Sequence, residues 1–170
     1  VAKHIQSFEH CYRRAPRWSA IRDGLVAVLE WPWQSVAELG EATFWWALAV
    51  LAEVDPSTDP DQILAAAGDM FPVTQVHSDR EFGRPDGDGS DWMLHIVRQL
   101  EGDRYVCGQV AYDSYLALDE FAAAGVKVDV QAWRPRGYRQ CWNEPFTPNL
   151  SVVDLLANVE PHDARRIVLG

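Results

Sequence analysis

The pattern of apolar residues changes after Gly68, and this change constrains the fold more than any other feature of the chain. Before Gly68, apolar side chains recur at helical spacing, as they do in residues 3–14. After it, short β-branched runs alternate with amphipathic stretches, which is typical of strands joined by helices. We therefore predict one α/β domain over residues 1–170, with a helical part (1–68) followed by a small three-layer parallel β-α-β-α-β unit (69–170).

The helical part is expected to contain four helices, because residues that start and stop helices divide it. Ser35 and Glu38 form a capping box before an apolar run, and Pro32 ends the helix that precedes it. Asp55-Pro56 ends the apolar run, since the residue before a proline disfavours helical backbone. The four predicted helices cover about residues 3–14, 16–30, 35–54 and 59–68.

The second part is expected to contain three strands and the helices between them. Gly125 suits the position that follows the end of a helix. Alternating strands and helices imply parallel strands with right-handed crossovers. Strands are predicted at about residues 71–77, 104–107 and 126–130, and helices at 92–100, at 114–124 and from about Ser151.

Composition argues against several classes of function. The net charge of -10 disfavours nucleic-acid or acidic-membrane partners, since phosphates attract basic surfaces. Cys11, Cys107 and Cys141 cannot all pair and match no zinc or redox spacing, which indicates free thiols in a reducing compartment. The longest apolar stretch, residues 42–54, is shorter than the ~20 residues of a membrane span, and no secretory signal opens the chain. We expect a cytoplasmic protein without membrane insertion, and no motif identifies a cofactor, a metal site or an oligomeric state.

Polar segments follow all three predicted strands, at the edge where ligands of open parallel sheets collect. His77 and Asp79 follow the first strand, residues 108–113 the second and residues 133–139 the third. We therefore expect these segments to share one edge of the sheet. The candidate catalytic residues are His77, Asp79 and Asp113, and the candidate ligand-binding residues are Gly108, Tyr112, Arg134, Arg136, Tyr138 and Arg139.

The catalytic candidates and the Gly108 turn also have plain structural interpretations. Gly108 precedes a helix start, where free N–H groups favour an anion, but Asp113 also suits an ordinary N-cap. His77 beside Asp79 suits a metal ligand or a general base with its orienting group, but a lone His next to an Asp is more often a surface pair. Both interpretations remain open from the sequence.

The segment from Trp133 to Trp142 contains three arginines and no acid, inside an acidic chain. Guanidinium groups suit phosphate or carboxylate, and the flanking aromatic rings suit a base or a sugar. The alternative is a solvated loop whose arginines pair with surface acids.

Two further motifs indicate structure and not chemistry. Residues 86–91 resemble a calcium loop but depart from the EF-hand pattern, so we expect a flexible loop that leads into a helix. Ser151 and Asp154 are predicted to form a capping box, with Leu150 and Leu155 as its hydrophobic staple.

Residues 105–116, 121–128 and 146–158 carry a resemblance to a known family. The last of these stretches reads Phe-Thr-Pro-Asn-Leu-Ser-Val-Val-Asp-Leu-Leu-Ala-Asn. This resembles the C-terminal signature of the WbqC-like family, in which a Tyr-Leu-Ser-Gly turn precedes a helix and a Phe-x-Pro-x-Leu-Ser-x-x-Asp-Leu-Leu-x-Asn run closes the domain. Residues 3–16 are similar to a helix near the middle of that family.

The chain departs from the family pattern in two places. Relatives usually open with a Gln-Pro-x-Tyr-Phe-Pro type portion that this chain lacks, and many show His-Pro-x-Tyr where it has Arg134-Pro135 and later Tyr138. We therefore expect a C-terminal portion of a longer bacterial protein, with Val1 as an internal start.

The resemblance implies a role in surface-polysaccharide (O-antigen) or specialised-metabolite biosynthesis. Two classes of function follow from it. One is a transferase-like enzyme acting on an activated phosphate-bearing donor, such as a nucleotide sugar or an acyl donor. The other is a non-catalytic ligand- or partner-binding module of a biosynthetic cluster.

Overall fold

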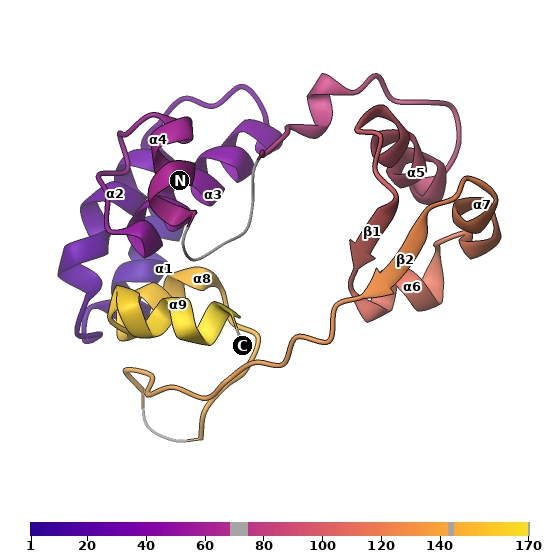
Figure 1. Ribbon diagram of the computed structural model, residues 1–170. Helices are drawn as coiled ribbons and strands as arrows, with labels where there is room; N and C mark the ends of the chain where they lie inside the picture. Colours follow the sequence, from indigo (N-terminus) through magenta and orange to yellow (C-terminus); the bar gives the residue numbers. More distant parts are fainter. Residues whose placement is uncertain (69–74, 143–144, 170) are drawn as a thin grey trace. The chain divides into compact units, whose positions relative to one another are not determined.

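The last residues of the chain return to its helical first part. The computed structural model describes residues 1–68, 75–142 and 145–169. Within it the chain divides into two units, formed by residues 1–76 with 135–170 and by residues 77–134 (Figure 1). We call them the helical unit and the α/β unit. Residues 135–170, which the sequence pattern grouped with the predicted strands, therefore belong with the helices.

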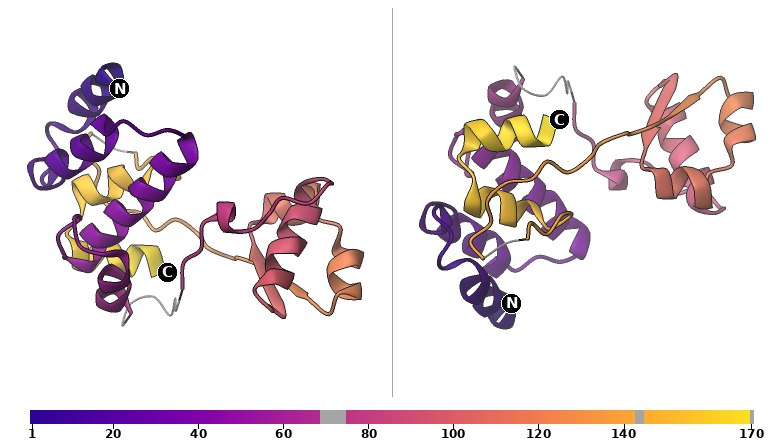
Figure 2. Two further views of the ribbon diagram at one scale, coloured as in Figure 1. Left: turned by 90° about the horizontal axis from the view of Figure 1, so that it is seen from above. Right: turned by 90° about the horizontal axis from the view of Figure 1, so that it is seen from below.

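The helical unit packs the first four helices of the chain against its last two. Figure 2 shows the two C-terminal helices lying against the N-terminal ones in both views, and α8 contacts α2 and α3 while α9 contacts α3. Its helices are α1 (Ala2–Tyr12), α2 (Trp18–Glu30), α3 (Val36–Ala52), α4 (Pro60–Ala67), α8 (Val152–Asn158) and α9 (Pro161–Leu169). The four predicted N-terminal helices are confirmed, whereas α9 was not foreseen.

Side-chain caps fix the ends of these helices. The Ser35 hydroxyl accepts from the Glu38 amide at 3.2 Å, and the Glu38 carboxylate accepts from the Ser35 amide at 3.2 Å, which confirms the predicted capping box. At the other end of α3, Arg165 of α9 donates to the Leu51 carbonyl and, at 2.7 Å, to the Glu53 carboxylate. A guanidinium at a helix C-terminus also suits the helix dipole. Arg165 therefore ties α9 to the end of α3.

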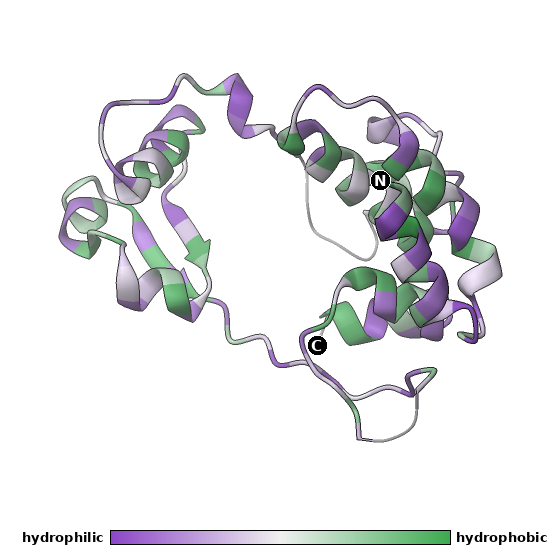
Figure 3. Cartoon of the chain, turned by 180° about the vertical axis from the view of Figure 1, so that it is seen from behind, coloured by the Kyte–Doolittle hydropathy of each residue, from purple (hydrophilic) through white to green (hydrophobic). Residues whose placement is uncertain are grey.

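One large apolar cluster holds the helical unit together. Trp46 of α3 and Leu156 of α8 are 2% and 1% exposed, and Ile21 and Leu25 of α2 pack in the same cluster. Figure 3 shows hydrophobic and hydrophilic residues alternating along these helices, as expected when each buries one face. Burial of one such aliphatic side chain stabilises a fold by about 1.5–3 kcal/mol. A second cluster joins α3 to α4 through Leu48, Ala49, Ile63 and Ala67.

The α/β unit is built around two parallel strands. Strand β1 (Arg104–Cys107) pairs with β2 (Lys127–Val130) in parallel, with Tyr105 opposite Val128. The connection between the strands is helical, so the predicted parallel crossover is confirmed. The remaining elements are a 3₁₀ turn η1 (Asp79–Glu81), α5 (Gly89–Gln99), α6 (Gln109–Ser114) and α7 (Leu118–Ala123).

The α/β unit differs from the prediction in its strand number and in one helix. The predicted strand at residues 71–77 lies mostly outside the described residues, and its described part, residues 75–77, is not strand. Among the described residues the sheet therefore has two strands, and the three-layer β-α-β-α-β arrangement is not found. The helix predicted at 114–124 is shorter and forms only as α7, because Leu116 is buried in the core and its carbonyl accepts from the Leu118 amide at 3.0 Å, which turns the chain. The helix α6 forms before that turn, over residues that were expected as a polar segment after the strand.

A small apolar core closes the α/β unit around Phe121, which is fully buried. The buried Ser90 hydroxyl accepts from the Ala117 amide at 2.8 Å and so joins the start of α5 to the turn before α7.

Two further predictions for this unit concern its turns. Gly125 has φ of 76°, the left-handed conformation expected after a helix end. Residues 86–91 lead into α5 as predicted: the helix begins at Gly89, and Asp88 and Asp91 make a capping box at its start. No described helix of either unit is long and apolar enough to span a membrane.

Candidate functional site

A polar pocket of about 610 Å³ opens in the helical unit between the end of α1, the segment that precedes α8, and α8 itself. Its size is within the range of small-molecule sites, and it combines aromatic rings with charged and amide groups. We call it the Asp154 pocket, after the buried carboxylate beside it. Its lining residues are Arg14, Pro16, Tyr138, Arg139, Gln140, Cys141, Trp142, Pro145, Phe146 and Asn158.

Asp154 is the centre of a buried hydrogen-bond network. Its side chain is fully buried, and its Oδ2 accepts from the Tyr138 hydroxyl at 2.7 Å and from the Gln140 amide nitrogen at 2.9 Å. The Asn158 amide nitrogen donates to Asp154 Oδ1 at 3.3 Å and to its backbone carbonyl at 2.8 Å. A buried carboxylate is tolerated only with such partners. The network therefore fixes the orientations of three side chains that line the pocket.

The start of α8 explains why Asp154 points inward. Ser151 is the N-cap, and its hydroxyl accepts from the Val153 amide at 3.1 Å. The predicted cap at Ser151 is thus confirmed, but the predicted capping box is wrong. Asp154 does not return to the helix start, because its carboxylate is directed to Tyr138 and Gln140. Leu150, the predicted staple residue, is 42% exposed.

Gln140 also shapes the wall of the pocket. Its amide nitrogen donates to the Thr147 carbonyl at 3.0 Å, and its amide oxygen accepts from the Thr147 backbone at 2.9 Å. A side chain that satisfies both backbone groups of Thr147 holds the two ends of this loop together. Gln140 is itself buried, so its amide connects Asp154 to the loop.

Burial shifts the ionisation of three groups around the pocket toward their neutral forms. The pKa of Tyr138 lies above its usual value because of burial, of its hydrogen bond to Asp154 and of that residue's charge. Burial, followed by the charge of Asp154, likewise raises the pKa of Tyr12 and that of the Cys141 thiol. These groups are protonated at neutral pH. Cys141 is consequently a poor nucleophile, because the thiolate is the reactive form.

The rim of the pocket carries two exposed arginines and an aromatic platform. Arg14 and Arg139 are both exposed, and neither forms an ion pair among the described residues. Trp142 is 37% exposed, and its ring centroid lies 5.3 Å from that of Tyr12. The Phe146 ring meets Tyr138 edge to face at 5.1 Å. The rim thus offers fork-shaped cations next to flat rings.

One polar atom of the pocket lacks a partner. The Asn158 side-chain oxygen is buried and accepts no hydrogen bond from any residue that the structure describes. Buried polar atoms are usually satisfied by protein, water or ligand. A donor group on a bound molecule would satisfy it, since Asn158 lines the pocket.

Together these groups suit recognition of an anion that carries a ring. Guanidinium groups bind phosphate or carboxylate by paired, charge-assisted hydrogen bonds. The rings of Trp142 and Phe146 suit the flat face of a base or a sugar. The described residues contain no group of three or more His, Cys, Asp or Glu side chains placed to hold a metal.

Two of the predicted ligand-binding residues, Tyr138 and Arg139, line this pocket. Arg136 belongs to the same unit but does not line it, whereas Arg134 belongs to the α/β unit. Gly108 and Tyr112 also lie in the α/β unit, where Gly108 is the N-cap of α6 and Tyr112 packs on the apolar core. Their predicted role in ligand binding stays a prediction.

The three predicted catalytic residues lie in the α/β unit, where the side chains of His77 and Asp113 have structural partners. The His77 Nδ1 atom lies 2.9 Å from a carboxylate oxygen of Glu81, and Asp79 begins the 3₁₀ turn η1 between them. Asp113 is in the last turn of α6, and its carboxylate accepts from the Gln109 amide at 2.8 and 2.9 Å. Asp113 is therefore not the N-cap that its alternative interpretation required. The catalytic roles of all three residues stay predictions.

Sequence reasoning missed Arg14, Gln140 and the buried position of Asp154. A signal for Asp154 was present: Asp154 and Asn158 are four residues apart in an otherwise apolar helix, and such a pair shares one helix face. The contribution of Arg14 depends on the return of residues 135–170 to α1. No local sequence pattern predicts the contact between these two parts of the chain.

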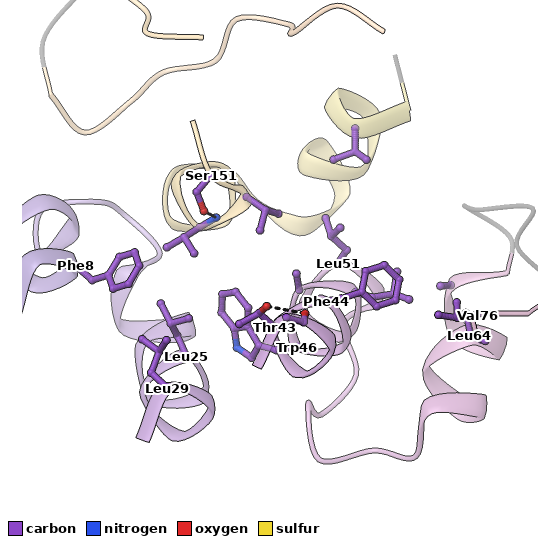
Figure 4. Close-up of a pocket in the computed structure, with 17 residues that line it drawn as sticks. Phe8, Leu25, Leu29, Thr43, Phe44, Trp46, Leu51, Leu64, Val76 and Ser151 are labelled. Atoms are coloured by element: carbon purple, nitrogen blue, oxygen red, sulfur yellow. Dashed lines mark hydrogen bonds between the residues drawn. The ribbon is translucent and has the colours of Figure 1, made fainter. Parts of the chain in front are cut away.

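A second cavity of the helical unit, of about 590 Å³, has a different chemistry. Figure 4 shows its lining, which is almost entirely apolar and includes Phe8, Leu25, Phe44, Trp46 and Leu51, with the hydroxyls of Thr43 and Ser151 as side-chain polar groups. Among the residues that the structure describes, no charged side chain lines this cavity to orient a ligand. The Asp154 pocket is therefore the stronger candidate site.

Two lining residues of the Asp154 pocket, Phe146 and Asn158, and the buried Asp154 beside it lie in residues 146–158, the stretch that carries the family resemblance. The model of the WbqC-like protein family matches residues 1–166. The chain belongs to the WbqC-like protein family. This match starts at the first residue, so it does not support the expectation that an N-terminal part of the family pattern is missing. Comparisons of this WbqC-like protein with curated proteins and with solved structures found no match.

Proposed function

We propose that this WbqC-like protein binds an activated, phosphate-bearing small molecule in the Asp154 pocket and acts as a transferase-like enzyme. A nucleotide sugar or an acyl donor of the coenzyme type has the required chemistry, namely a diphosphate beside a flat ring. Membership of the family supports a place in surface-polysaccharide or specialised-metabolite biosynthesis.

The observation that carries the proposal is the shared position of Arg14 and Arg139 on one pocket. They come from distant parts of the chain, and the buried Asp154 network fixes the wall beside them. Two guanidinium groups on one pocket in a chain of net charge -10 create a local site for an anion.

The same network fixes one wall of the pocket and leaves it without a reactive group. Tyr138 and Cys141 are protonated, and Asp154 already accepts hydrogen bonds from three side chains. A transferred group would thus be attacked by a nucleophile of the second substrate, while the pocket holds the donor. Proximity and orientation alone accelerate such reactions substantially.

The second candidate function is a non-catalytic binding module. It is favoured by the same protonated groups, which leave no free nucleophile among the described lining residues. The two functions are separated by incubating the protein with a nucleotide sugar or acetyl coenzyme A and analysing the donor by mass spectrometry. Donor cleavage supports the enzyme, and binding without cleavage supports the module. Absence of binding by both donors contradicts both proposals.

A further inference from the structure

A groove of about 470 Å³ in the helical unit gathers four of the eight tryptophans of the chain. Trp31 and Trp33 come from the connection between α2 and α3, and Trp45 and Trp46 come from α3. The turn from Asp55 to Thr58 forms its polar edge. We call it the tryptophan groove. It shares with the Asp154 pocket none of its lining residues.

The indole rings at the mouth of the groove are held in place and remain accessible. Trp31 is 63% exposed, and its ring centroid lies 6.1 Å from that of Trp33. The Trp33 indole nitrogen donates to the Val28 carbonyl at 2.7 Å, which fixes this ring against α2. An exposed large ring beside an anchored one forms a platform for a flat, partly apolar ligand.

Small residues form the floor of the groove. A Cβ atom on Gly24 would lie 2.9 Å from the Trp46 indole nitrogen, a contact too short to be tolerated without movement. Gly24 therefore allows the edge of this ring to approach α2. Figure 4 shows that the Trp46 nitrogen lies on the side of the ring away from Ser151.

The Trp46 nitrogen also lacks a hydrogen-bond acceptor. Trp46 is 2% exposed, and its indole N–H donates to no atom in the part of the chain that the structure describes. A buried donor without a partner is costly, and native proteins rarely keep one. Because Trp46 lines the groove, a ligand bound there lies near this ring and changes the surroundings of its N–H group.

The polar edge of the groove consists of a carboxylate and hydroxyl groups, from Asp55, Ser57 and Thr58. The Asp55 carboxylate accepts from the Ser57 hydroxyl at 2.7 Å and from the Ser57 amide at 2.8 Å. These bonds lower the pKa of Asp55 and keep it an acceptor at neutral pH. No lysine or arginine lines the groove, so it does not suit an anionic ligand.

We propose that the tryptophan groove binds an uncharged saccharide, whose ring stacks on Trp31 and whose hydroxyls bond to the Asp55–Thr58 turn. A pyranose has an apolar face of C–H groups that matches an indole and a rim of hydroxyls that matches a carboxylate. This proposal does not rest on the Asp154 pocket, because the two sites differ in residues and in ligand charge.

The test follows the indole N–H signals of ¹⁵N-labelled protein by nuclear magnetic resonance. The probes are neutral methyl pyranosides (glucoside, galactoside, mannoside, rhamnoside and N-acetylglucosaminide), added at millimolar concentration. We expect at least one to shift the Trp31 and Trp46 signals. Trp31→Ala and Asp55→Asn should each weaken its binding about tenfold, which is 1.4 kcal/mol. Trp133→Ala, at an exposed tryptophan (45%) outside the groove, should leave binding unchanged.

Two results would overturn the proposal. The first is that no pyranoside shifts the Trp31 or Trp46 signal, in particular if a proline-rich peptide does shift them. The second is that Trp133→Ala weakens binding as much as Trp31→Ala does. Inorganic pyrophosphate is added in a separate titration, and the saccharide site should be unaffected by it. Failure of the donor site and failure of the saccharide site are thereby observed separately.

Discussion

The hydroxyl of Tyr138 donates a hydrogen bond of 2.7 Å to Asp154, a carboxylate that is fully buried. Tyr138 belongs to the segment that follows the α/β unit, and Asp154 belongs to α8 of the helical unit. The bond therefore fastens the returning chain to the helix on which it packs. It also orients the Tyr138 ring, which lines the proposed donor site, and the Asp154 carboxylate beside it.

Replacing Tyr138 by phenylalanine should destabilise the helical unit by about 1–3 kcal/mol, because Asp154 loses a donor while it stays buried. Urea denaturation followed by circular dichroism measures this loss. The control is Tyr115→Phe, at a tyrosine that is 49% exposed in the α/β unit. Equal midpoints for the wild type and Tyr138→Phe would show that the bond contributes nothing.

Stability should fall at alkaline pH because burial raises the pKa of Tyr138 and that of Tyr12. The unfolded chain ionises these phenols at about pH 10, whereas the folded protein keeps them protonated. The contribution of these two protonated phenols to the free energy of unfolding is thus complete below about pH 10 and decreases as the pH rises above that value. Denaturation between about pH 8 and pH 11 should show a smaller decrease for Tyr138→Phe than for the wild type. An identical decrease in both proteins would contradict the assignment.

Cys141 should react slowly with iodoacetamide at neutral pH, because burial and the charge of Asp154 raise the pKa of its thiol. Mass spectrometry of peptides after timed alkylation measures the rate, with glutathione as the reference thiol. Unfolding the protein in urea should restore the rate of an ordinary cysteine. Faster alkylation of Cys141 than of glutathione would identify an activated thiol and contradict this account.

Replacing Ser151 by alanine should destabilise the fold by about 1 kcal/mol through loss of the α8 cap. The effect should appear in the denaturation midpoint and not in pyrophosphate affinity, since Ser151 does not line the Asp154 pocket. Ser7→Ala is the control, because this exposed hydroxyl donates to the Lys3 carbonyl of the same helix and caps no helix end. An unchanged midpoint with lost affinity would place Ser151 in the site.

Local signals predicted most of the helices and both observed strands. Ser35 with Glu38 and Asp59 with Pro60 are short-range cap patterns, so α3 and α4 were correctly foreseen. The strand at Arg104–Cys107 was also located correctly, as a short segment between two helical patterns. The contacts of residues 135–170 were not foreseen, because they depend on long-range packing. The partners of Asp154 could not be inferred for the same reason.

For the candidate site, too, the sequence predicted local features and not long-range contacts. Arg139 was predicted from local charge, and it lines the Asp154 pocket. Arg14 was not predicted, although Arg13, Arg14 and Arg17 also form an acid-free cluster, because these residues were assigned to helices and not to a site. The expected convergence at strand ends assumed three strands, whereas two are described. A pocket between helices α1 and α8 has no such topological rule, so it could not be located from the sequence.

Calorimetric titration with inorganic pyrophosphate tests the central claim most directly. Arg14→Gln and Arg139→Gln should each weaken binding by about 1.5–3 kcal/mol, which corresponds to at least tenfold, because a charge-assisted contact is lost. Arg13→Gln is the matched control, as it removes a neighbouring exposed arginine that does not line the pocket. The account predicts that Arg13→Gln binds pyrophosphate like the wild type. Equal affinity in all four proteins, or no binding by the wild type, would contradict the assignment of the Asp154 pocket as a phosphate site.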